Sequence, residues 1–109
     1  MHEYSIALEI SKIAEKQAED KNISEIFLSI GTLSGIFDES LKFYLEQIFK
    51  EKYQSPVLIT TEQIDAEFNC ECGKSYNTDN MLKPCPFCNN YTRTIVKGNE
   101  CIIKSITLE

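Results

Sequence analysis

Four of the five cysteines stand in two close pairs, Cys70-Glu71-Cys72 and Cys85-Pro86-Phe87-Cys88. A structural zinc site takes four soft ligands at the corners of a tetrahedron, and thiolates can supply all four. Gly73 follows the first pair and permits a tight turn, while Pro86 fixes one dihedral angle inside the second pair. The two pairs therefore predict a zinc site whose ligands are Cys70, Cys72, Cys85 and Cys88.

The first pair is short, because only Glu71 separates its two cysteines. Residues two apart on an extended strand point to the same face, so the two sulfurs can reach the separation of roughly 3.8 Å that zinc requires. Buried free thiols, two disulfides and a rubredoxin-like iron site are the alternatives, and zinc is favoured over each of them. Cys101 stands alone and is predicted to be a small buried hydrophobic residue; it is also the alternative ligand if Cys72 cannot serve.

The chain start offers a second set of metal ligands, although a lone histidine near a terminus is in general more often a frayed surface residue. The amine of Met1, the amide nitrogen of His2 and its imidazole can chelate one ion, and the backbone nitrogen of Glu3 could complete a plane. Nitrogen-rich square-planar sites suit Ni(II) or Cu(II). Deprotonating the amides would release protons, so binding should weaken at low pH. The Glu3 carboxylate has an equally simple interpretation, since an acid in the first helical turn favours the helix dipole.

Hydrophobic periodicity indicates the elements that must position these residues. A helix is predicted from the chain start to about residue 20, with Ile6, Ile10, Ile13, Ala14 and Gln17 at helical spacing. Residues 25–30 alternate as a strand, a second helix follows with Asp38 as its N-cap, and residues 57–66 form another strand. Residues 101–108 alternate again, with Ile102, Ile106 and Leu108 on one face and Lys104 as an exception on that face.

This order predicts an α+β fold in which two helices pack on a small three-stranded sheet. A zinc-ribbon-like lobe, residues 67–96, is inserted between the last two strands of that sheet. Residues 1–66 together with 97–109 are predicted to form the other lobe, which carries the chelating terminus. The inserted segment is too short to fold by apolar burial alone, so metal binding should contribute to its folding.

Composition excludes several classes of function. The 109 residues carry 11 basic and 17 acidic side chains, a net charge of −6, which argues against binding to nucleic acid or to a membrane surface. No apolar run exceeds three residues, so we expect neither a membrane span nor a signal peptide, and we expect a cytoplasmic protein. The single histidine stands in no recognisable relation to a nucleophile, and the chain is predicted not to be an enzyme.

Several segments together resemble the HypA family of nickel metallochaperones, which mature nickel–iron hydrogenases. They are Met-His-Glu-Tyr-Ser at residue 1, Gly31-Thr32-Leu33-Ser34-Gly35, the cysteine pairs, Gly98-Asn99-Glu100 and Ser105-Ile106-Thr107-Leu108-Glu109. The resemblance implies nickel bound by Met1, His2 and Glu3, and zinc bound by the four paired cysteines. It also implies a companion GTPase and the hydrogenase large subunit as partners, and some relatives serve urease and its maturation proteins. The alternative is a structural or regulatory zinc-ribbon adaptor in which the N-terminus is passive.

Overall fold

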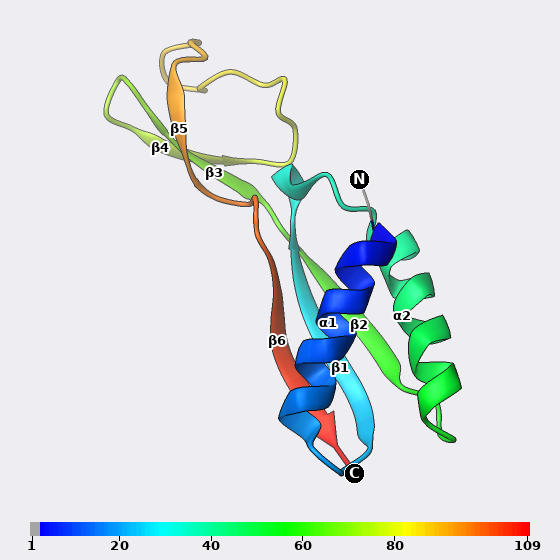
Figure 1. Ribbon diagram of the computed structural model, residues 1–109. Helices are drawn as coiled ribbons and strands as arrows, with labels where there is room; N and C mark the ends of the chain where they lie inside the picture. Colours follow the sequence, from blue (N-terminus) through cyan, green and yellow to red (C-terminus); the bar gives the residue numbers. More distant parts are fainter. Residues whose placement is uncertain (1–2) are drawn as a thin grey trace.

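The computed structural model describes residues 3–109, which form an elongated molecule of 54 × 21 × 16 Å (Figure 1). Its radius of gyration is 17.0 Å, whereas a compact chain of this length would have about 13 Å. The elements, in chain order, are α1 (Glu3–Ala18), β1 (Ile23–Gly31), a 3-10 turn (Thr32–Ser34), α2 (Asp38–Lys52), β2 (Leu58–Ile64), β3 (Ala66–Cys70), β4 (Ser75–Thr78), β5 (Arg93–Lys97) and β6 (Cys101–Leu108).

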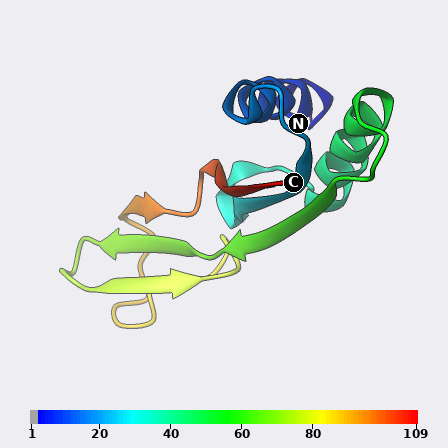
Figure 2. The same ribbon diagram turned by 90° about the horizontal axis from the view of Figure 1, so that it is seen from below.

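The first sheet has the strand order β2-β1-β6, with β1 parallel to β2 and antiparallel to β6. Both helices cover the same face of this sheet (Figure 2). The predicted arrangement of two helices on a three-stranded sheet is therefore confirmed. Its core contains alternate residues of β1, one stripe of α2 and the small residues of α1, namely Ile26, Leu28, Ile30, Leu41, Leu45, Phe49, Ala7, Ala14 and Ala18.

The buried face of α1 differs from the one that the hydrophobic pattern predicted. Ile13 is 53% exposed and Gln17 is also exposed, whereas Ala7, Ser11 and Ala18 are buried. Alanine and serine let the helix axis approach α2 and the sheet closely, so the centre of the contact follows small residues rather than large ones. The prediction that Ile13 and Gln17 lie on the buried face was wrong for this reason.

A β-bulge decides which residues of β6 face the core. Phe27 pairs with Ser105 while its neighbour Leu28 pairs with Ile103, so Lys104 is an extra residue in β6. Before the bulge Ile103 contacts the core, and after it Ile106 does. The predicted common face of Ile102, Ile106 and Leu108 was therefore wrong, because Ile102 and Leu108 are 51% and 36% exposed.

The same bulge explains why Lys104 interrupted the apolar pattern. Its Nζ atom lies 2.8 Å from a carboxylate oxygen of Glu62 and 5.5 Å from the centre of the Phe27 ring. Both partners come from the neighbouring strands β2 and β1, so the lysine side chain lies across the sheet. Lys104 is thus a partner in an ion pair on the sheet surface.

The start of α2 lies one residue away from its predicted position. Asp38 is already helical, and Phe37 occupies the N-cap position without a side-chain hydrogen bond. The Asp38 carboxylate instead accepts a hydrogen bond of 2.9 Å from the backbone N–H of Glu39. The prediction of Asp38 as N-cap was wrong, although its charge still lies in the first turn, where it favours the helix dipole.

The second sheet has the order β4-β3-β5 and is antiparallel throughout. It begins at Ala66, which a single residue separates from the end of β2. It extends to Lys97, which pairs with Glu67. Its buried cluster is small and consists of Ala66, Phe68, Cys70, Tyr76 and Cys85. The division of the chain into two lobes at residues 66/67 and 96/97 stays a prediction.

Backbone contacts join the two sheets at the end of β1. Gly31 donates a hydrogen bond of 2.8 Å to the Glu100 carbonyl, and Leu33 donates one of 2.6 Å to the Gly98 carbonyl. Leu33 also packs its side chain against the buried cluster of the second sheet. Gly98 has φ +109°, which favours glycine, and a Cβ atom there would stand 2.6 Å from the Ala66 Cα. The close approach of these backbones requires glycine at this point.

Candidate metal centres

The four paired cysteines come together at one end of the second sheet. All four sulfurs lie within 4.8 Å of one another. The sulfurs of Cys70 and Cys88 are 3.4 Å apart, and those of Cys72 and Cys85 are 3.9 Å apart. A tetrahedral zinc with Zn–S bonds of about 2.3 Å needs sulfur separations of roughly 3.8 Å. All five cysteines of the chain are free thiols, so the four clustered sulfurs form a group that could hold a metal ion.

A tight turn positions the first cysteine pair. Cys70 ends β3, its N–H donates to the Lys74 carbonyl at 2.8 Å, and the Gly73 N–H donates back to the Cys70 carbonyl at 2.9 Å. Gly73 has φ +91°, a conformation that side chains disfavour. The turn places Cys72 beside Cys70 although a single residue separates them. The shortened pair thus presents both sulfurs to the same point.

A second turn positions the other pair. The Asn89 N–H donates to the Cys85 carbonyl at 2.8 Å, and the Cys85 N–H donates to the Asn90 carbonyl at 3.0 Å. Asn89 adopts φ +62°, which asparagine tolerates better than most residues. The backbone between Cys85 and Asn90 therefore closes into a loop, which brings Cys88 back toward the first pair.

The pKa values of Cys85 and Cys88 are shifted in opposite directions. Burial by itself raises the pKa of Cys85, but hydrogen bonds from the backbone N–H groups of Phe87 and Cys88, together with the neighbouring sulfurs, lower it to about 7. Contact with the Cys70 sulfur, together with burial, raises the pKa of Cys88 to about 12. One thiol of the cluster therefore loses its proton readily, whereas the neighbouring sulfurs oppose the loss of a second proton. A divalent cation removes that opposition, so the donor set fits zinc.

Cys101 is outside this cluster. It begins β6, is partly buried and packs against the core of the first sheet. Burial raises the pKa of its thiol. Its predicted role as a small hydrophobic residue agrees with this position, and Cys72, not Cys101, lies with the other three sulfurs.

Arg93 stabilises the segment that carries the cysteines, a role that the sequence pattern did not predict. Its guanidinium stacks 4.0 Å from the centre of the Phe68 ring and donates to the Tyr76 hydroxyl and to the carbonyls of Met81 and Lys83. A usable signal did exist, because Arg93 is the only arginine in the sequence. Its planar guanidinium can stack on a ring and at the same time present a rigid fork of donors to several carbonyls, a geometry that the lysine ammonium lacks.

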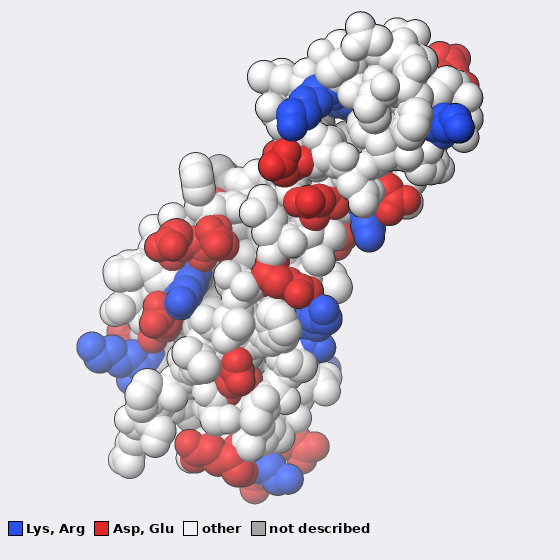
Figure 3. Space-filling model, turned by 180° about the vertical axis from the view of Figure 1, so that it is seen from behind, with Lys and Arg blue, Asp and Glu red and all other residues white. Residues whose placement is uncertain are grey.

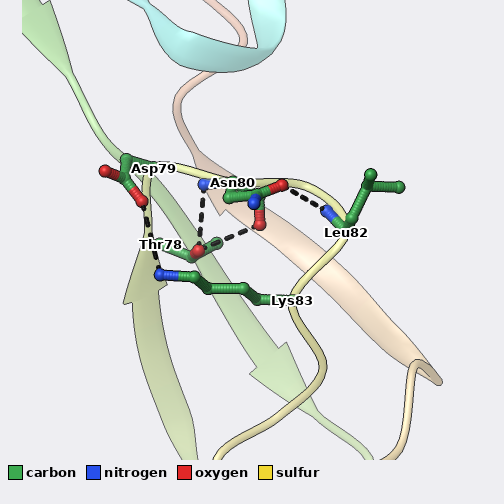
Figure 4. A network of polar contacts seen from close by, with 5 residues as sticks. All are labelled: Thr78, Asp79, Asn80, Leu82 and Lys83. Carbon is green, nitrogen blue, oxygen red and sulfur yellow. Dashed lines mark hydrogen bonds and ion pairs between the residues drawn. The ribbon is translucent and has the colours of Figure 1, made fainter.

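A network of local hydrogen bonds shapes the loop that Arg93 holds (Figure 4). The Thr78 hydroxyl donates to the Asn80 carbonyl and accepts from the Asn80 N–H, both at 3.0 Å. The Asn80 side chain accepts from the Leu82 N–H at 2.9 Å, and Lys83 lies 3.9 Å from Asp79. These bonds order the long connection between β4 and the second cysteine pair.

The predicted nickel ligands Met1 and His2 lie outside the described residues. Glu3 begins α1, and its carboxylate accepts a hydrogen bond of 3.3 Å from the backbone N–H of Phe37. The first turns of α1 and α2 therefore lie side by side (Figure 1). The Glu3 carboxylate thus contacts the N-cap residue of α2.

On the face shown in Figure 3, acidic and basic side chains are interspersed, with acidic groups prominent where the two sheets meet. Within the described residues, no helix is long and apolar enough to cross a membrane.

The helix-covered sheet and the four-thiol lobe together define a small two-sheet metal-binding protein. Residues 1–108 match the model of the family HypA, described as "Hydrogenase/urease nickel incorporation, metallochaperone, hypA". The chain belongs to the HypA family. The predicted family and its nickel metallochaperone function in hydrogenase maturation are thereby confirmed, and the zinc adaptor without a nickel role is not favoured. Nickel as cargo and structural zinc are the metals of this family.

Individual relatives match over their whole length. The chain is 34% identical to the hydrogenase maturation factor HypA of Parabacteroides distasonis, covering all of this chain and 98% of the relative. It is 37% identical to that of Pelodictyon phaeoclathratiforme, covering all of this chain and 97% of the relative. The solution structure of the nickel metallochaperone HypA from Helicobacter pylori aligns with a TM-score of 0.67 at 21% identity, over 99% of this chain and 97% of the other. A second HypA solution structure aligns with a TM-score of 0.70, also at 21% identity, over 100% of this chain and 97% of the other. These structures share the fold.

Proposed function

We propose that this protein carries Ni(II) on its chain start, with the amine of Met1, the amide and imidazole of His2 and the backbone nitrogen of Glu3 as ligands. Residues 1–66 and 97–109 are the lobe that carries nickel. The observation that carries the proposal is the position of Glu3 at the first turn of α1. The first N–H groups of a helix have no partner within it, so the Glu3 nitrogen can lose its proton without breaking a helical hydrogen bond.

Proton balance gives this site a route to release its cargo. Each amide nitrogen that becomes a ligand gives up its proton to solvent, and both the Met1 amine and the imidazole must be neutral to bind. The proton returns to each nitrogen when the ion leaves for a recipient. Nickel binding should therefore strengthen as pH rises, and a recipient site with preformed anionic ligands can take the ion.

Residues 67–96 form the zinc lobe in this proposal, with Cys70, Cys72, Cys85 and Cys88 as ligands. The sulfur separations of 3.4 and 3.9 Å support tetrahedral binding. Zinc supplies a positive charge that keeps four crowded thiolates together. Only four of the five residues in the buried cluster of the second sheet, Phe68, Cys70, Tyr76 and Cys85, lie in this lobe, so its folding should depend on the metal.

The remaining features of the proposal concern partners and place. We infer that the protein works in the cytoplasm with a companion GTPase and the hydrogenase large subunit, and that urease maturation proteins are further candidates. It binds neither nucleic acid nor membrane and catalyses no reaction of its own. Its net charge of −6 and the absence of a catalytic motif support these inferences.

Calorimetric titration of untagged, zinc-loaded protein with Ni(II), followed by metal analysis, tests the proposal. We expect one nickel per chain in addition to one zinc. His2→Ala and a one-residue extension before Met1 should each abolish nickel binding and leave zinc at one per chain. Cys72→Ser is the matched control, because it should lower zinc binding. Unchanged nickel affinity in the extended variant would show that the amine is not a ligand, and the proposal would fail.

A further inference from the structure

The first turn of α1 is attached to α2 and to its N-cap residue by two separate contacts. The Glu3 carboxylate accepts the Phe37 N–H at 3.3 Å, and the Tyr4 ring meets the Tyr44 ring edge to face with 5.4 Å between ring centres. Tyr4 is 53% exposed, so the sheet does not hold it in place. Tyr44 is partly buried and packs against the core of the first sheet, which makes it the fixed member of the pair.

These contacts lie immediately after the predicted nickel ligands. Fixing backbone dihedral angles on metal binding costs conformational entropy and opposes binding. If residues 3 and 4 are already fixed, fewer dihedral angles must be ordered when the ion binds. The apparent affinity of a site falls in proportion to the fraction of molecules in the competent conformation.

We propose that Tyr44 is a positioning residue for the nickel site: it holds Tyr4, and through it the first turn of α1, in the conformation that binds the ion. This inference rests on the proposed function, since it presumes nickel at the chain start. Tyr44 does not touch nickel. The hydrogen bond between Glu3 and Phe37 holds the same turn in place. Loss of this bond together with the Tyr4–Tyr44 contact should therefore weaken nickel binding more than loss of either contact alone.

The test compares nickel affinities of variants that keep every proposed ligand. Tyr44→Ala and Tyr4→Ala should each weaken nickel binding, by up to about fivefold, which is about 1 kcal/mol for an aromatic pair. Tyr4→Ala alters an exposed side chain and should fold even if Tyr44→Ala does not. Tyr4→Phe and Tyr44→Phe keep the rings and should bind nickel as the wild type does. Ile13→Ala is the matched control, because Ile13 is equally exposed on the same helix, 53%, and lies away from its first turn.

A second measurement separates positioning from a general structural effect. Nickel affinity is measured between pH 6.5 and 8.5 for the wild type and for Tyr4→Ala. The affinity of Tyr4→Ala should be lower than that of the wild type by the same factor at every pH. The number of protons released per nickel bound should be the same in both proteins. Loss of a ligand would instead change that number. Zinc content should remain one per chain. Unchanged nickel affinity in Tyr4→Ala, or an equal loss in Ile13→Ala, would overturn the inference, whereas absence of nickel binding by the wild type would overturn the proposed function itself.

Discussion

Replacing Gly31 by alanine should disrupt the junction between the two sheets. Gly31 has φ −76° and ψ 143°, which any residue adopts, so the effect is purely steric. A Cβ atom there would overlap the Gly98 carbonyl and stand 2.9 Å from the Asn99 nitrogen. Relief requires a backbone shift of about 1 Å, which breaks the hydrogen bonds from Gly31 to Glu100 and from Leu33 to Gly98. Each of the two broken hydrogen bonds costs about 1–3 kcal/mol, so we expect a loss of about 2–6 kcal/mol.

Gly35 provides a matched control, because its backbone conformation favours glycine but the space around it is open. It has φ +73°, but a Cβ atom there would meet nothing within 4 Å. Gly35→Ala should therefore cost only the left-handed conformation, about 1–2 kcal/mol. The comparison separates steric exclusion from backbone preference at two glycines four residues apart.

Urea denaturation of the zinc-loaded proteins measures both effects. Gly31→Ala should unfold at clearly lower urea than Gly35→Ala, and hydrogen exchange at the Gly31 and Leu33 amides should speed up selectively in its native state. If Gly31→Ala destabilises the protein no more than Gly35→Ala does, the junction is not closely packed and the reasoning is wrong.

Three further predictions concern side chains outside the junction. Arg93→Lys should destabilise the second sheet by about 2 kcal/mol in denaturation experiments, because lysine loses the stacking and the forked hydrogen bonds; equal stability would contradict this. Cys101→Ser should leave zinc at one per chain by metal analysis while Cys72→Ser lowers it, and the partly buried wild-type Cys101, whose pKa is raised by burial, should react slowly with alkylating reagents at pH 8.5. The hydrogen bond from Lys104 holds the pKa of Glu62 below its ordinary value of 4.5. The stability that Glu62 contributes is therefore present above pH 4.5 and lost as pH falls through the lowered pKa, so Glu62→Gln should flatten the acid side of a plot of melting temperature against pH.

Local patterns predicted the type of nearly every element of the first sheet and failed on which faces are buried. In α1, hydrophobicity pointed to Ile13, yet small residues form the contact because helix approach is limited by side-chain volume. In β6, strict alternation failed at Lys104, because a bulge depends on the pairing partner β1 and leaves no local signature. Both errors come from judging one segment without its neighbour.

The sequence by itself determined which residues can bind metal, since ligand type and close spacing are chemical properties of short segments. Cys70 and Cys72, two residues apart, and Cys85 and Cys88, three apart, needed no long-range information to be recognised as pairs. Only the tertiary structure decided that the two pairs meet, that Arg93 holds the loop between them, and that Tyr44 and Phe37 hold the first turn of α1. Those contacts join residues from 10 to 40 positions apart, and their formation depends on how whole elements pack, which no local pattern encodes.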